Sequence, residues 1–176
     1  MKEYRIDSSE LKALCPSLRA GDRVILSGTV YTSRDAAHKR IFEYLDTGRQ
    51  LPYRLKGAVI YYAGPTPAPQ GLAVGSCGPT TSKRMDPYTP RLLDLGVAAT
   101  IGKGERSAEV QDAIIRNKSV YLCAIGGAGA LAAQSIAECE VTAFDDLGCE
   151  SVKRLVFRDF PLIAAIDCSG GNIFRR

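Results

Sequence analysis

The chain has 176 residues, which is enough for one domain with a sizeable core. Its 23 Lys and Arg residues against 19 Asp and Glu residues give a net charge of +4. This mild, evenly spread charge gives no indication of a nucleic-acid partner. The charged start of the chain lacks a signal-peptide pattern, and no apolar run approaches the roughly 20 residues that span a bilayer. We therefore expect a cytoplasmic protein with no membrane partner.

The cysteines are widely separated along the chain. They stand at Cys15, Cys77, Cys123, Cys139, Cys149 and Cys168. No two have a CxxC or zinc-type spacing, and nothing marks the chain as secreted. We expect reduced thiols and no metal site within this chain.

Short apolar runs alternate with amphipathic stretches, which predicts a mixed α/β domain. Residues 23–30 are expected to form a strand. Residues 34–45 follow as a helix with capping residues before it and Gly48 after it. Residues 58–63 (AVIYYA) have the pattern of a buried strand, and the proline-rich residues 64–71 that follow are expected to be a loop.

The second half continues the same alternation. The expected elements, in order, are a loop at 78–86, a helix at 91–95, a strand at 97–101, a helix from Ser107 to 117, a strand at 119–125, a small-residue helix from 126 to 137, a strand at 141–144, a short helix at 150–154 and a strand at 162–166. No linker or repeat interrupts this order, so we expect one domain over residues 1–176.

Three loops that follow predicted strands combine cations with glycines and hydroxyls. They are Ser27–Asp35, Gly78–Arg84 and Ile101–Gly104. An arginine fork binds a carboxylate through two parallel hydrogen bonds, lysine adds a point charge, and glycines let backbone N–H groups approach an anion. If the loops converge, they form a small anion-selective pocket. In the alternative interpretation, the loop arginines pair with neighbouring carboxylates, Arg34 with Asp35 and Arg84 with Asp86.

Three other features have simpler interpretations. His38, the single histidine, shares a helix face with Arg34 and is interpreted as a structural or solvent-facing residue rather than an acid or base. The glycine-rich turn at 126–129 lacks GxGxxG, so close helix packing is favoured over dinucleotide binding. Cys77 is interpreted as a small buried residue.

Taken together, five segments resemble the class I fumarate hydratase / L(+)-tartrate dehydratase beta subunit, which also forms the C-terminal domain of single-chain class I fumarases. The segments are Ser27–Arg40 (SGTVYTSRDAAHKR), Gly64–Pro67, Gly78–Asp86 (GPTTSKRMD), Tyr88–Pro90 and Ile101–Gly104. The resemblance extends over nearly the whole chain, from about residue 4 to residue 174.

The resemblance implies an α/β domain of the swivelling β/β/α type with a mixed sheet. It also implies an iron–sulfur hydro-lyase that interconverts fumarate plus water and (S)-malate. The [4Fe–4S] cluster would be held by three cysteines of a separate alpha subunit, with the fourth iron acting as a Lewis acid. The chain would then work in a hetero-oligomer, with a small dicarboxylate as its substrate.

By the same resemblance, Arg34 and Arg84 would bind substrate carboxylates and Lys103 would be a further cationic contact. Thr80 would be the candidate base for the C3 proton of malate, assisted by a carboxylate of the alpha subunit. The remaining matched positions are glycines that would let the loops close on the ligand: Gly28, Gly78 and Gly102.

Two alternatives stay open. The first is the beta subunit of L(+)-tartrate dehydratase, with the same machinery and a dihydroxy substrate. Lys83 stands where the family often has glycine, and its added charge bears on this choice. The second is a dicarboxylate-binding module with no activity of its own.

Overall fold

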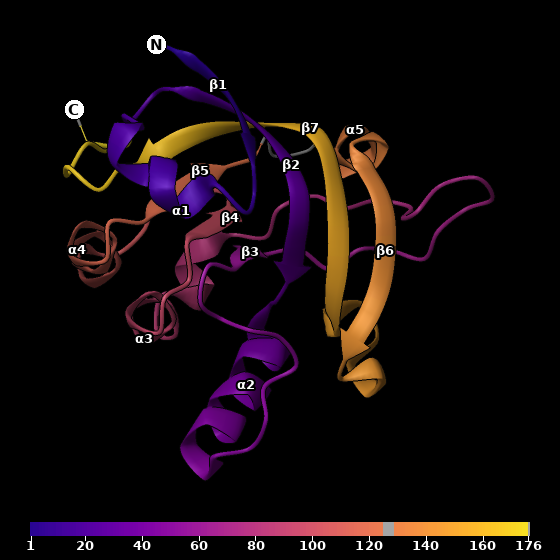
Figure 1. The fold of residues 1–176 in the computed structure, drawn as a ribbon. Helices are drawn as coiled ribbons and strands as arrows, with labels where there is room; N and C mark the ends of the chain where they lie inside the picture. The colour runs from indigo at the N-terminus through magenta and orange to yellow at the C-terminus, as the bar shows by residue number, and fades with distance from the viewer. Residues whose placement is uncertain (125–128, 176) are drawn as a thin grey trace.

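A computed structural model describes residues 1–124 and 129–175 (Figure 1). Its strands are β1 (Glu3–Asp7), β2 (Arg23–Thr32), β3 (Val59–Tyr61), β4 (Ala99–Gly102), β5 (Val120–Cys123), β6 (Ile136–Ala143) and β7 (Val152–Ile166). Its α-helices are α1 (Leu11–Leu14), α2 (Asp35–Thr47), α3 (Thr89–Asp94), α4 (Ala108–Arg116) and α5 (Gly129–Gln134). Short 3-10 turns are η1 (Cys15–Ser17), η2 (Ser82–Met85) and η3 (Asp145–Glu150). Among the described residues, no helix is long and apolar enough to span a membrane.

The strands form one mixed sheet that closes on itself. The order is β1-β2-β3-β4-β5-β7-β6, and β2 also pairs with β7. Strands β1 to β5 run parallel to one another, whereas β7 is antiparallel to β2, β5 and β6. The pairings from β2 through β3, β4 and β5 to β7 and back to β2 therefore make a small barrel-like arrangement. The mixed α/β class expected from the sequence is confirmed.

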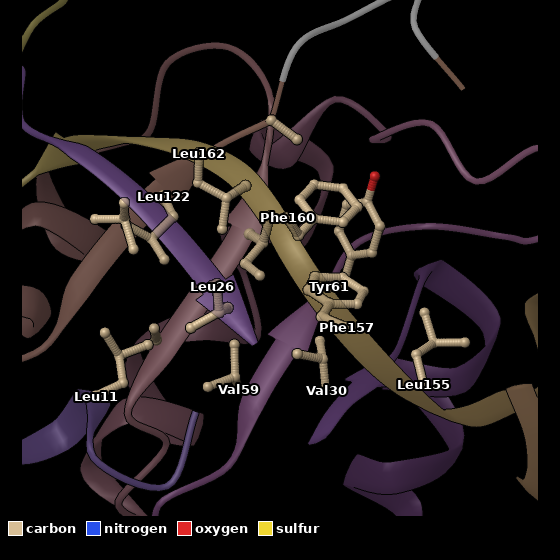
Figure 2. Packing of buried hydrophobic residues seen from close by; sticks show 14 of the residues in the cluster. Leu11, Leu26, Val30, Val59, Tyr61, Leu122, Leu155, Phe157, Phe160 and Leu162 are labelled. Carbon is tan, nitrogen blue, oxygen red and sulfur yellow. The ribbon is translucent and has the colours of Figure 1, made fainter. Parts of the chain in front are cut away.

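The main core fills the inside of this closed sheet (Figure 2). The rings of Phe157 and Phe160 on β7 stack with centroids 4.2 Å apart, and Tyr61 meets both rings edge-on. Aliphatic side chains of β2, such as Leu26 and Val30, pack with them and are fully buried. Burial of these large apolar side chains is the main favourable contribution to folding.

A second core lies where α2, α3 and α4 cover the sheet. In Figure 1, α4 and α3 lie at the left of the view and α2 lies at the bottom. Helix α2 buries Ala37, His38 and Ile41 and ends at Gly48, whose φ of +67° suits the left-handed C-cap. Helix α4 begins after Ser107, whose side-chain oxygen accepts a hydrogen bond from the backbone N–H of Val110. Both helices were expected near these positions.

Three local predictions are wrong. Residues 150–154 form no α-helix, because β7 extends from Val152 to Ile166. The helix expected up to residue 137 ends at Gln134, and β6 begins at Ile136. The first part of the Ser27–Asp35 segment is not a loop, since β2 continues to Thr32. Strand β1 and helix α1 were not expected at all.

Candidate active site

The carboxyl ends of four parallel strands lie at one edge of the sheet. The register places Thr32 of β2 beside Tyr61 of β3, and Tyr61 beside Ile101 of β4. Gly102 in turn lies beside Cys123 of β5. The segments that follow these strands therefore start from the same edge, and α/β sheets, open or closed, commonly bind ligands beyond the carboxyl ends of their parallel strands. Three of these segments contain residues expected at the site.

Arg34 lies between β2 and α2, and its side chain is about one-fifth exposed, at 22%. Its Nη2 lies 3.4 Å from Oε1 of Glu150. A Cβ added at Gly64 would lie 2.9 Å from Nη1, so the glycine leaves the space that the guanidinium occupies. Its buried Nε has no hydrogen-bond partner in the described part of the chain. Arg34 is thus held in place while some of its donor capacity stays unused.

Arg84 lies on η2 and is half-exposed. Its Nε and Nη2 donate to the two carboxylate oxygens of Asp35, at 3.1 and 2.7 Å. The pairings suggested by adjacency in the sequence are therefore wrong. Asp35 binds Arg84 rather than Arg34, and Asp86 binds Arg106 rather than Arg84.

Thr80 and Lys103 lie on two segments that are tied together at the same edge. The Thr80 N–H donates to the carbonyl of Tyr62 at 2.7 Å, directly after β3. Thr81 forms an isolated parallel bridge with Lys103, and the Ser82 N–H donates to the Lys103 carbonyl at 2.9 Å. Thr80 is half-buried and Lys103 is exposed. These backbone contacts place Thr80 and Lys103 on neighbouring segments at this edge of the sheet.

The three predicted glycines differ in how closely other atoms approach them and in where they lie in the fold. A Cβ at Gly102 would overlap Oγ of Ser82 and lie 2.9 Å from the Tyr62 ring, so this close approach requires glycine. A Cβ at Gly78 would have its nearest neighbour at 3.5 Å, an ordinary contact. Gly28 lies within β2, with φ +98°, against Asp7 of β1. The structure therefore does not bring Gly28 to the edge that carries the other predicted residues.

His38 is structural, as interpreted from the sequence. It is fully buried, and its Nδ1 lies 2.8 Å from the Arg34 carbonyl and 2.9 Å from Oγ of Ser33. A carbonyl only accepts hydrogen bonds, so Nδ1 carries the proton. Burial lowers the pKa of His38 to about 4, which keeps the imidazole neutral near pH 7. The side chain fixes the backbone from which Arg34 extends.

Neither Glu150 nor Arg106 was predicted from the sequence as a residue of the site. Glu150 contacts Arg34 through one oxygen and accepts from the Ala36 N–H through the other, at 2.9 Å. Arg106 is fully buried and paired with Asp86. Glu150 is distant in sequence from its partners, and no pattern distinguishes Arg106 from a surface arginine.

The cysteines do not fit the ligand set of an iron–sulfur cluster. Burial raises the pKa of the Cys15 and Cys77 thiols to about 12, so both stay protonated. Within residues 1–124 and 129–175, no group of three or more Cys, His, Asp or Glu side chains is placed to share a metal ion.

The glycine-rich turn at 126–129 lies almost entirely outside the described residues. Helix α5, which begins at Gly129, has six residues.

Comparisons with known proteins concern the sequence as a whole. The sequence model described as Fumarase C-terminus matches residues 1–176. Fumarate hydratase 2 of Leishmania major is 42% identical over 89% of this chain and 28% of its own length. The anaerobic class I fumarate hydratase of Escherichia coli K12 is 38% identical over 95% of this chain and 31% of its own length. The L(+)-tartrate dehydratase subunit beta of the same strain is 34% identical over 89% of this chain and 79% of its own length.

The mixed sheet and the helices that pack on it define an α/β domain whose parallel strands carry cationic residues after their carboxyl ends. The chain belongs to the fumarase C-terminus family, whose model matches it from end to end. It spans about three-tenths of the length of the fumarate hydratases that it matches.

Proposed function

We propose that this chain is the beta subunit of a class I hydro-lyase that interconverts fumarate plus water and (S)-malate. The observation that supports this most directly is the gathering of Arg34, Arg84, Lys103 and Thr80 around one edge of the sheet. In this proposal, residues 1–176 form one swivelling β/β/α domain of a cytoplasmic hetero-oligomer. A [4Fe–4S] cluster would be carried by its alpha subunit.

The charges at the edge suit a dicarboxylate. Fumarate and malate each present two carboxylates, and Arg34 and Arg84 each offer a planar fork for one of them. Lys103 adds a third positive charge at the same edge of the sheet. Hydrogen bonds to charged groups contribute roughly 1.5–3 kcal/mol each, so this set would dominate substrate binding.

Thr80 would act as the base that removes the C3 proton of malate. In the dehydration direction the C3–H and C2–O bonds break, the double bond forms between C2 and C3, and the C2 hydroxyl leaves as hydroxide, which becomes water when it takes up the proton removed from C3. Thr80 would accept the C3 proton, and hydration would return it. A threonine hydroxyl is a weak base, so the proposal requires a carboxylate of the alpha subunit to take the proton onward.

The beta subunit of L(+)-tartrate dehydratase is the second candidate. The observation that supports it is similarity, because the L(+)-tartrate dehydratase subunit beta of Escherichia coli is 34% identical over 89% of this chain. Its substrate is also a dicarboxylate, so the two arginines would have the same role. The second hydroxyl of tartrate would need one further polar contact.

The test is an anaerobic co-expression with the alpha-type chain of the same organism. The purified complex is assayed for fumarate hydration and for L-tartrate dehydration, and this chain alone serves as the control. We expect hydration of fumarate by the complex and no activity in the isolated chain. A preference for tartrate would select the second candidate. Dicarboxylate binding by the isolated chain, with no activity in the complex, would instead indicate a binding module.

A further inference from the structure

The Arg106 guanidinium lies wholly inside the protein and contacts Asp86, two residues from Arg84. The Arg106 side chain is 0% exposed, and its Nε donates to Oδ1 of Asp86 at 2.6 Å. Its Nη2 donates to Oγ1 of Thr89 at 2.7 Å, and its Nη1 donates to Oγ1 of Thr100 at 3.2 Å. All three nitrogens of the fork are therefore bound within the protein.

Both carboxylate oxygens of Asp86 accept hydrogen bonds from the 106–107 segment. While Oδ1 accepts from Arg106, Oδ2 accepts from the backbone N–H of Ser107 at 2.7 Å. Asp86 directly follows η2, which carries Arg84, and Arg106 follows the turn that carries Lys103. The buried pair thus fastens the 78–86 segment to the 102–107 segment.

Two tyrosines complete the connection. The Arg106 guanidinium lies over the rings of Tyr62 and Tyr121, at 5.3 and 4.8 Å from their centroids. The Tyr121 hydroxyl bridges Oγ of Ser82 and the Gly104 carbonyl, at 2.8 and 2.9 Å. The Tyr62 carbonyl holds the N–H of Thr80. The contacts around Arg106 therefore reach residues within two positions of Thr80, Arg84 and Lys103.

Stability alone gives a weak reason for such a pair. The cost of removing two charges from water can exceed their mutual attraction, and well-packed apolar side chains often stabilise a protein as well or better. What apolar side chains do not supply is directional hydrogen bonding to Thr89, Thr100 and the Ser107 N–H. The pair adds buried, directional contacts to the backbone contacts and the Tyr121 bridge that also join the two loops.

We propose that Arg106 and Asp86 are positioning residues for the candidate site. They set the relative placement of Thr80, Arg84 and Lys103 without touching the substrate. The inference rests on the proposed function for its kinetic consequence, but its structural part concerns this chain alone. Loss of the fork should therefore reduce turnover and dicarboxylate affinity while the protein remains folded.

The experiment compares Arg106→Lys with Arg116→Lys. Arg116 makes a two-hydrogen-bond pair with Asp94, at 2.8 and 3.0 Å, but this pair is exposed and joins α4 to α3. For Arg106→Lys in the alpha–beta complex we expect kcat to fall about 100-fold, the scale of a 1 Å misplacement, and KM for fumarate to rise. Arg116→Lys should change neither by more than about 2-fold, since exposed pairs contribute little.

Hydrogen exchange on the full chain gives a second readout that needs no activity. In Arg106→Lys we expect faster exchange in residues 78–86 and 102–107, with the β6 and β7 amides unchanged. Asp86→Asn, which keeps the shape of the side chain, takes its place if the lysine variant does not fold. Uniformly faster exchange, or activity lost only in proportion to unfolding, would show a merely structural pair and overturn the proposal. Wild-type kinetics in a folded variant would overturn it as well.

The two readouts also separate this inference from the proposed function. If the wild-type complex acts on neither fumarate nor tartrate, the proposed function fails, and the exchange pattern alone then decides whether the pair orders the two loops.

Discussion

Arg84 and Asp35 join two segments that are 49 residues apart in the sequence through two parallel hydrogen bonds. Asp35 is the first residue of α2, so the pair ties η2 to the helix that begins directly after Arg34. Both candidate carboxylate-binding arginines are therefore connected through one acidic residue. Because the pair uses the Nε–H and one N–H of Nη2, the second N–H of Nη2 and both N–H groups of Nη1 are left to donate to a ligand.

Arg84→Lys should affect function far more than stability. The Arg84–Asp35 pair is substantially exposed, so its loss should change the free energy of unfolding by less than about 1 kcal/mol. Lysine cannot bind a carboxylate through a fork, so we expect transition-state binding to weaken by about 2–3 kcal/mol. Urea unfolding and kcat/KM of the complex measure the two effects. Wild-type kcat/KM would remove Arg84 from the site.

Thr80→Val tests the proposed proton transfer. Valine matches the shape of threonine but lacks the hydroxyl, and the backbone N–H that anchors Thr80 is retained. Loss of an acid–base group should lower kcat by about 10²–10⁴-fold. Thr81→Val, at the exposed neighbouring position, is the matched control and should stay near wild-type. If both variants keep wild-type kcat, Thr80 is not the base.

Gly102→Ala should destabilise the chain where Gly78→Ala does not. The added methyl group at position 102 overlaps Oγ of Ser82 and presses on the Tyr62 ring, and such overpacking typically costs about 1–3 kcal/mol. At position 78 the nearest atom is 3.5 Å away, so the change should stay within about 1 kcal/mol of wild-type. Thermal unfolding of both variants checks the difference. Equal destabilisation would contradict the close approach at Gly102.

His38 should make the chain less stable as the pH falls from about 6.5 to about 4. Burial lowers its folded pKa to about 4, with Asp35 favouring and Arg106 opposing the charged form, whereas the unfolded residue titrates near 6.5. Between these values the unfolded chain binds one more proton, which favours unfolding by up to about 1.4 kcal/mol per pH unit. Urea unfolding across this range measures the slope. His38→Gln should flatten it, and an unchanged slope would assign the effect to other groups.

Helices α2 and α4 were predictable from the sequence, and Ser107 caps α4 as expected. The capping residues expected before α2 do not cap it, since its N-cap is Arg34, with no side-chain cap hydrogen bond. The α2 segment combines apolar residues at helical spacing with Gly48 at its end, and its predicted bounds differ from the observed ones by one or two residues. β3 and β4 were also predictable, because their short buried runs end in turn residues. These signals are local, and the surrounding structure agrees with them.

The elements and contacts that depend on segments distant in the sequence were not predicted. Val152, Leu155 and Val156 have the i, i+3, i+4 spacing of a helix face, but their segment pairs with β2 and β6 as β7. β1 was missed because Ile6 is its one buried residue. The location of the cationic loops after strands was predictable. Their carboxylate partners were not, since Glu150 lies more than a hundred residues from Arg34.

The closing of the sheet by β7 has a consequence for folding kinetics. Arg23 of β2 lies beside Ile163 of β7, so this contact must wait for most of the chain to be in place. Pairings between such distant segments carry a large entropy cost before they contribute stability, which makes folding slow. Until β7 arrives, one edge of β2 is open to other strands, and newly made chains are then most prone to aggregate.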